Sequence, residues 1–130
     1  LNANYLNNIC IYFYMSDTEI ESQADFESLL KKNPGVVVVK LGAEWCGPCK
    51  LIEKEVHEFF EKSPANMKTV QLDVDDSFDI YANLKRKKIV TAIPALLCYK
   101  KNNNSLVPDD VLIGADKAEL EKFFKRCLQY

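Results

Sequence analysis

The stretch VVVVKLGAEWCGPCK, residues 36–50, decides how the rest of the chain is interpreted. It joins an apolar, β-branched run to the pair Cys46 and Cys49, and a helix-like segment at 50–62 follows. A Cys-x-x-Cys between a buried strand and a helix places a thiol at the helix N-terminus, where unpaired N–H groups and the helix dipole favour negative charge. Because the thiolate is the reactive form of cysteine, the pattern predicts a redox pair. Cys46 is the expected reactive thiol, and Cys49, one turn later, is close enough to form a disulfide with it.

The bulk composition is typical of one globular domain. The chain has 130 residues, of which 48% are apolar and 28% charged, and its net charge is −2. This charge gives no electrostatic case for nucleic acid or an anionic membrane as a partner, and we expect neither. The basic cluster KRKK at 85–88 is either a solvated helix end or a binding patch.

The cysteine count favours a redox role of the pair over two other uses. There are five cysteines, an odd number, whereas a secreted disulfide framework usually has an even and denser set. A zinc site would need two further ligands, and His57 is the only histidine. His57 lies between charged neighbours, which is typical of a solvated side chain. We therefore expect no metal, and a reducing, cytoplasmic compartment.

The N-terminal residues are expected to lie outside the folded domain. We expect residues 1–17 to be an N-terminal extension, either flexible or not native, followed by one domain at 18–130, because Met15 is itself a candidate start site. The apolar run at 9–15 is too short to span a bilayer, and residues 1–8 lack the basic region of a secretory signal. A strand or a docking segment is the alternative interpretation of this run.

Hydrophobic periodicity predicts the order β-α-β-α-β-α-β-β-α. Gly and Pro mark most of the boundaries, the segment 75–77 is expected to cap the third helix, and Asp116 the last. This order implies an α/β fold with one mixed sheet of four or five strands and helices on both faces. The expected strands are 19–21, 36–41, 68–74, 95–99 and 111–113, and the expected helices are 23–32, 50–62, 78–87 and a final one after Asp116.

Three motifs together resemble the thioredoxin family, over about residues 18–130. The segment AEWCGPCK at 43–50 is similar to the family's active-site stretch throughout. Ile93-Pro94, before an apolar strand, is similar to its cis-proline turn. Gly114 is similar to the glycine after its last strand. The resemblance implies a thioredoxin fold.

It also implies a protein-disulfide oxidoreductase that reduces its targets and serves electron transport and redox homeostasis. Cys46 would attack the target disulfide as an exposed thiolate, and the more buried Cys49 would resolve the mixed disulfide. A reductase of the thioredoxin-reductase type would recycle the pair, with no cofactor bound to this chain, which we expect to be a monomer. The residues implied to face the substrate are Trp45, Gly47, Pro48, Ile93, Pro94 and Gly114.

Two departures from the family pattern lie behind the cysteines. Lys40 holds the place of a buried acid that takes up a proton, and Gln71 holds the place of that acid's lysine partner. Water, Glu44 or Asp73 would then have to accept the proton. Lys40 is either a charged ammonium that lowers the thiolate pKa, a buried neutral amine, or a side chain that snorkels to the surface. In the first case it stabilises the reduced form and makes the pair a better oxidant.

The remaining departures are smaller. The helix after the site lacks the family's kinking proline and has Lys54 in that region. The segment 75–94 is longer than usual, which places 85–88 beside the expected substrate edge, where it would recognise an acidic partner or disfavour the usual reductase. Cys98 and Cys127 are expected to be buried as small hydrophobes, which leaves Cys10 as the most reactive of the extra thiols.

Two alternative functions stay open at this point. A disulfide-donating oxidase or isomerase would be favoured by Lys40, although the Gly-Pro pair inside the motif argues for reduction. A binding module with the same fold and a vestigial pair would not require both Cys46 and Cys49, and both are present.

Overall fold

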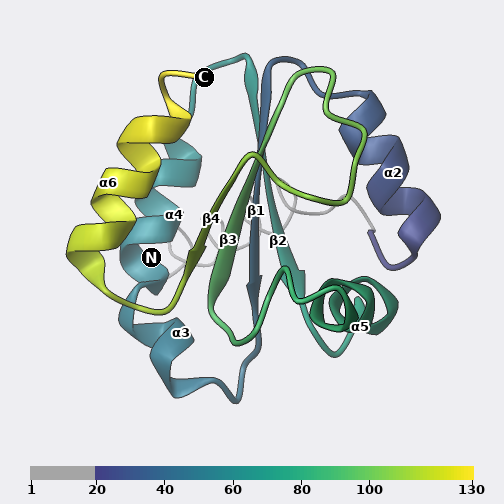
Figure 1. The fold of residues 1–130 in the computed structure, drawn as a ribbon. Helices are drawn as coiled ribbons and strands as arrows, with labels where there is room; N and C mark the ends of the chain where they lie inside the picture. Colours follow the sequence, from purple (N-terminus) through teal and green to yellow (C-terminus); the bar gives the residue numbers. More distant parts are fainter. Residues whose placement is uncertain (1–19) are drawn as a thin grey trace, which may run out of the picture.

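The computed structural model describes residues 20–130 of the chain (Figure 1). Residues 1–19 lie outside the described part, and with them the predicted extension at 1–17, the apolar run at 9–15 and Cys10. The helices are α2 (Gln23–Lys31), α3 (Gly47–Leu51), α4 (Glu53–Glu61), α5 (Phe78–Arg86) and α6 (Lys117–Cys127), and the strands are β1 (Val36–Gly42), β2 (Met67–Asp73), β3 (Ala95–Lys100) and β4 (Asp110–Ile113).

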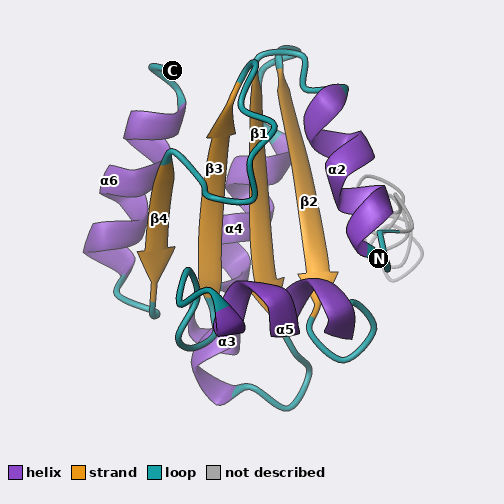
Figure 2. Ribbon diagram, turned by 45° about the vertical axis from the view of Figure 1, so that its right-hand side comes forward, coloured by secondary structure: helices purple, strands orange, loops and turns teal. Residues whose placement is uncertain are grey.

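The four strands form one mixed sheet in the order β2-β1-β3-β4. Strand β1 pairs parallel with β2 and antiparallel with β3, and β3 pairs antiparallel with β4. Helices α2 and α5 cover one face of this sheet, while α3, α4 and α6 cover the other (Figures 1 and 2). The predicted mixed sheet between two helical layers is therefore confirmed.

Strand β1 is the centre of the fold, because all seven of its residues are buried. Val37, Val39 and Leu41 belong to an apolar cluster shared with α2 and α5. Val36 and Val38 belong to a second cluster, which β1 shares with α4 and α6. A strand that is apolar on both faces is typical of a sheet covered by helices on each side, as the sequence predicted.

Two helices, α2 and α6, begin at the capping residues that the sequence predicted. Helix α2 begins with a capping box, in which the Ser22 Oγ accepts from the Asp25 N–H and the Asp25 carboxylate accepts from the Ser22 N–H. Helix α6 begins at its predicted cap, since Asp116 Oδ1 accepts from the Ala118 and Glu119 N–H groups. Within residues 20–130, no helix has the length and apolar composition that crossing a membrane would require.

The first predicted strand, 19–21, is wrong in its described part. Ile20 and Glu21 have no strand structure, and Glu19 lies outside the described residues. Ile20 is instead buried at 4% exposure in the cluster of α2 and α5, and its carbonyl oxygen accepts a 2.6 Å hydrogen bond from Ser77 Oγ. This bond also corrects the predicted cap of α5, because the hydroxyl that was expected to cap the helix is engaged with Ile20.

The predicted helix 50–62 is two helices, α3 and α4, separated at Ile52. Ile52 has φ −114° and ψ 6°, and it is fully buried beneath the two helices. The interruption forms without a proline in the sequence to mark it. Lys54, in the region where the family carries its proline, lies within the first turn of α4.

Asn33 provides a test of how the α2–β1 connection is held. Its side chain is buried, donates to the Tyr99 carbonyl at 3.0 Å and accepts from the Gly35 N–H at 2.8 Å. We expect Asn33→Ala to lower the free energy of unfolding by about 1–3 kcal/mol, because two buried partners lose their hydrogen bonds. Urea denaturation of Asn33→Ala beside the exposed control Asn104→Ala checks this, and equal midpoints would contradict it.

Candidate active site

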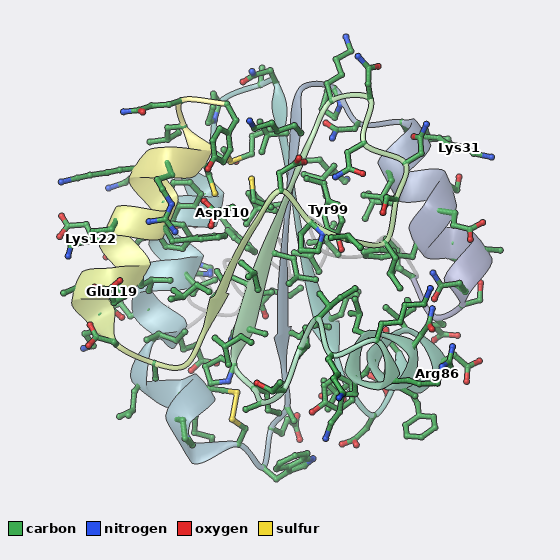
Figure 3. All side chains as sticks on the ribbon, viewed as in Figure 1. Lys31, Arg86, Tyr99, Asp110, Glu119 and Lys122 are labelled. Carbon is green, nitrogen blue, oxygen red and sulfur yellow. A yellow bond between two sulfur atoms is a disulfide. The ribbon has the colours of Figure 1, made fainter. Side chains whose placement is uncertain are left out.

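The two active-site cysteines lie where β1 gives way to α3. Strand β1 ends at Gly42, Cys46 is the N-cap residue of α3, and Cys49 lies in its first turn. The two side chains form a disulfide with a Cα–Cα distance of 5.3 Å, visible as a yellow bond beside α3 in Figure 3. The predicted proximity of Cys46 and Cys49 is thus present as a covalent bond.

One backbone N–H group donates to the first sulfur. The Cys49 N–H donates to Cys46 Sγ at 3.2 Å, as the side chain of an N-cap residue accepts from the first turn. Pro48 occupies the first turn of α3, where a missing N–H costs little. The first turn of α3 contains no acidic residue. After reduction, these groups favour a thiolate on Cys46 over one in water.

Exposure does not distinguish the two cysteines in this disulfide form. Cys46 was expected to be exposed and Cys49 more buried, but each is 4% exposed. The disulfide form does not show the expected contrast, which stays a prediction for the reduced thiols. The two sulfurs differ instead in their neighbours, which lie on opposite sides of the bond.

On one side, Cys46 Sγ lies 3.9 Å from the Ile93 carbonyl oxygen. The Ile93–Pro94 peptide bond is cis, as the family resemblance implied. Pro94 is tied to the last strand of the sheet, since its carbonyl oxygen accepts from the Gly114 N–H at 2.9 Å. Gly114 has a φ of +113°, a conformation that favours glycine, and this explains why a glycine follows β4.

Cys49 Sγ and the Lys40 side chain both approach Gly42. A methyl group added to Gly42 would lie 3.4 Å from Cys49 Sγ and 3.6 Å from Lys40 Nζ, so both side chains contact the same small space beside Gly42. Lys40 is only 6% exposed, so most of its side chain is buried. Burial lowers the pKa of Lys40 below its usual value, and the negative charge of Glu53 partly opposes this shift.

The other groups considered as proton acceptors have different surroundings. Gln71 is paired with Lys40 across the parallel strands, and its buried Nε2 has no hydrogen-bond partner in the structure. Glu44 is exposed to solvent. Asp73 Oδ1 accepts from the Asp75 and Asp76 N–H groups and so stabilises the turn after β2. Lys40 is the titratable side chain that the structure places in the same space as Cys49.

Three exposed apolar side chains, on the segment before Cys46, on α3 and on α5, are called the apolar rim. Trp45 is 67% exposed, yet its position is fixed, because its Nε1 donates to Asp75 Oδ2 at 2.8 Å. Leu51 on α3 and Phe78 on α5 are 62% and 63% exposed. The sequence predicted Trp45 at the site but missed its partner Asp75, which had been assigned to a helix cap.

Two other predicted features lie outside this rim. The basic residues 85–88 are all exposed, and Lys85 Nζ lies over the Tyr81 ring at 5.5 Å. His57 on α4 lies 3.4 Å from Glu61, away from the cysteines. Across residues 20–130, the structure gathers no group of three or more side chains suited to holding a metal ion.

Comparison with known proteins places the chain in a class and then in a family. The structure superimposes on Plasmodium falciparum thioredoxin with a TM-score of 0.66, at 31% identity, covering 82% of this chain and 95% of that one. Oxidised mitochondrial thioredoxin 3 of Saccharomyces cerevisiae gives a TM-score of 0.68 at 30% identity, covering 84% and 93%. The fold and the disulfide therefore define a protein-disulfide oxidoreductase with the thioredoxin fold.

Sequence comparison gives the family itself. The thioredoxin family model matches residues 17–126. Thioredoxin 1 of Plasmodium falciparum is 34% identical over 107 residues, which is 82% of this chain and 93% of that protein. The thioredoxin of Equus caballus is 35% identical over 108 residues, covering 82% and 94%. The chain belongs to the thioredoxin family, and the alternative of a disulfide-donating oxidase or isomerase is not favoured.

The bond between Trp45 and Asp75 gives a prediction about the rim. In Asp75→Ala, the indole loses its acceptor and we expect it to move freely, so that KM for a disulfide substrate rises while kcat changes little. Trp45 is the only tryptophan in the chain, so a fall in its fluorescence anisotropy reports the motion directly. Asp76→Ala is the matched control, since Asp76 is also exposed in the same turn. Unchanged anisotropy in Asp75→Ala would contradict the assigned role.

Proposed function

We propose that this chain works in the reducing direction, with Cys46 as the attacking thiol and Cys49 as the resolving thiol. The observation that carries this assignment is the asymmetry around the disulfide. Cys46 Sγ accepts from a backbone N–H and lies beside the Ile93 carbonyl, whereas Cys49 Sγ lies inward beside Gly42 and Lys40. The environment of Cys46 suits a thiolate that attacks a bound substrate chain. The environment of Cys49 suits a thiol that attacks Cys46 from the interior of the protein.

The reaction then has two steps with balanced electrons. The Cys46 thiolate attacks one sulfur of a target disulfide, and the leaving target thiolate takes up a proton. Cys49 next loses its proton and attacks Cys46 Sγ in the mixed disulfide, which releases the second target thiol. The pair ends as the disulfide seen in the structure, and the target has gained two electrons and two protons.

The substrate is proposed to bind as an extended segment along Ile93 and Pro94. A chain placed there hydrogen-bonds to backbone in the manner of an added strand, which gives affinity for many sequences. Trp45, exposed directly before Cys46, is proposed to provide apolar contact area for that segment. The remaining residues proposed to face the substrate are Gly47, Pro48 and Gly114.

Replacing each cysteine tests the assignment. We expect Cys49→Ser to accumulate stable mixed disulfides with an insulin-type substrate, because the attack occurs and the resolution does not. Cys46→Ser should trap nothing, and both variants should lose turnover under a working electron donor. Mass spectrometry of the trapped species identifies the bonded cysteine. Trapping by Cys46→Ser instead would mean that the two roles are reversed.

We further propose that Lys40 accepts the proton of Cys49 during resolution. Burial lowers the pKa of Lys40, so the free amine is more accessible than it is on a solvated lysine. Once protonated, the ammonium lies next to the new thiolate and stabilises it. The family's buried acid is absent from this chain, and Lys40 occupies both its position and, in this proposal, its task.

Lys40→Met tests this role while keeping the volume nearly constant. We expect resolution of the mixed disulfide at neutral pH to slow by about tenfold or more, since a positioned base contributes at least that much. The rate should recover with rising pH as solvent deprotonates Cys49. The reduction potential should also become more negative, because the reduced form loses a stabilising charge. The control is Lys54→Met on the exposed side of α4.

Stability provides an independent measurement on the same variants. An ammonium buried with a lowered pKa destabilises the folded state most below that pKa, and the cost disappears as pH rises toward the unfolded value of 10.5. Lys40→Met should therefore be more stable than the parent at pH 7, with a difference that narrows at alkaline pH. If Lys40→Met and the parent chain had the same pH dependence of the resolution rate and the same reduction potential, the proposal for Lys40 would be wrong, even if their stabilities differed.

The remaining assignments are proposals that the family supports. A reductase of the thioredoxin-reductase type is proposed to recycle the disulfide, and the chain is proposed to act as a monomer in the cytoplasm with residues 1–17 as an extension. Cys98 and Cys127 are free thiols, which suits a reducing compartment. Among relatives, however, the Saccharomyces cerevisiae protein that is 32% identical over 112 residues is mitochondrial. Localisation of a tagged full-length chain distinguishes the two compartments.

A further inference from the structure

A second pair of thiols lies in the core, apart from the active site. Cys98 is in the middle of β3 and is 0% exposed, and Cys127 is the last residue of α6 and is 1% exposed. Both belong to the apolar cluster between the sheet and α4 and α6. Figure 1 places α3, which carries the active-site disulfide, and the C-terminal end of α6 at opposite ends of the molecule.

The two thiols are direct partners. A hydrogen bond with Cys98, together with burial, raises the pKa of Cys127 well above that of an ordinary thiol. In the closed structure Cys127 is therefore protonated, and a protonated thiol reacts poorly with oxidants. The sequence predicted Cys98 and Cys127 as separate buried thiols, and their burial is confirmed. It did not bring them together, because they come from elements far apart in the chain.

A polar clasp covers the place where these thiols meet. Arg126 forms two hydrogen bonds with Asp110, Nε at 2.7 Å and Nη2 at 3.1 Å, and Tyr130 donates its hydroxyl to the same carboxylate at 2.7 Å. Asp110 lies opposite Cys98 in the β3–β4 register, and Figure 3 shows it far from the active-site disulfide. Lys100 Nζ also lies 4.5 Å from the centre of the Tyr130 ring.

The clasp determines when the pair can react. Cys127 lies between Arg126 and Tyr130 in sequence, so release of these two contacts frees the last turn of α6. The terminal turn of a helix opens with a much lower free energy than the core does. Opening of this turn would expose Cys127 and lower the burial that keeps its thiol protonated. Cys98, on the sheet beneath, would become accessible in the same event.

We propose that Cys98 and Cys127 form a second, non-catalytic disulfide when the chain meets a peroxide, and that this bond ties α6 to β3. The Cys127 thiolate attacks one peroxide oxygen, the O–O bond breaks, and a sulfenic acid and water form. The Cys98 thiolate then attacks the sulfenic sulfur and expels hydroxide, which leaves as water with the released proton. Two thiols and one hydrogen peroxide thus give one disulfide and two waters.

The test uses the full chain with the other thiols removed, as Cys10→Ser/Cys46→Ser/Cys49→Ser. Treatment with hydrogen peroxide should lower the intact mass by about 2 Da, and non-reducing peptide mapping should join the peptides of Cys98 and Cys127. The oxidised form should show a higher Tm than the reduced form, because the cross-link restricts the unfolded chain. Adding Cys98→Ser should abolish both effects.

Two further variants test the role of the clasp. Arg126→Ala in the same background should form the bond several-fold faster, because the last turn opens more often. Lys125→Ala is the matched control, since Lys125 neighbours Arg126 on α6 but pairs with Glu121 and not with Asp110. Oxygen addition without cross-linking, disulfide-linked dimers, or no reaction even in Arg126→Ala would each overturn the proposal. Peptide mapping of the oxidised parent chain should show the same Cys98–Cys127 link.

Discussion

Burial of β1 on both faces and along both edges is the constraint on which the rest of the structure depends. Every residue of this strand is buried, with β2 on one side and β3 on the other. Such a strand is held rigidly, because any displacement would disturb two apolar clusters and two hydrogen-bonded ladders at once. The active-site disulfide begins four residues after its end. The precision of the chemistry is therefore a consequence of the packing behind it.

The same constraint explains the unusual electrostatics of the site. Side chains alternate along a strand, so a residue two before Gly42 must point to the face on which α3 lies. That residue is Lys40, and the protein keeps an amine there in a layer that is otherwise apolar. Burial of an unpaired ammonium is costly, which is why the pKa of Lys40 is lowered. A position with such a cost is one where function is a better explanation than stability.

Patterns of hydrophobic residues were enough to predict most of the fold. They located β1, β2, α2, α5 and α6 to within one or two residues, and the motif at 43–50 located the disulfide. They missed two features. The helix after the active site is interrupted at Ile52, and the Ser77 hydroxyl bonds to Ile20 instead of capping α5. No proline marks the interruption in the sequence, and the Ser77 bond depends on a partner whose position only the folded chain determines.

The residues of the active site also divide into those that a motif predicted and those that only the folded chain brings together. Cys46, Cys49 and the cis Ile93–Pro94 bond could be inferred from motifs, because the chemistry restricts those residue types closely. The Asp75 bond to Trp45 and the pairing of Cys98 with Cys127 could not, because both join segments that the sequence keeps apart. The role of Lys40 could be predicted only in part. Its identity was visible in the sequence, but its burial next to Cys49 was decided by the packing of α3 on the sheet.

The division of the core into two clusters has a consequence for how this protein could change over time. The residues beneath α2 and α5 and those beneath α4 and α6 are separated by the sheet, and they share only its strands. Substitutions in separate layers usually have additive effects on stability. The α5 side, which carries Phe78 and the basic residues 85–88, is thus free to diverge toward new partners. The layer that holds Lys40 and Cys49 need not change with it, so partner choice and electron chemistry can evolve as independent traits.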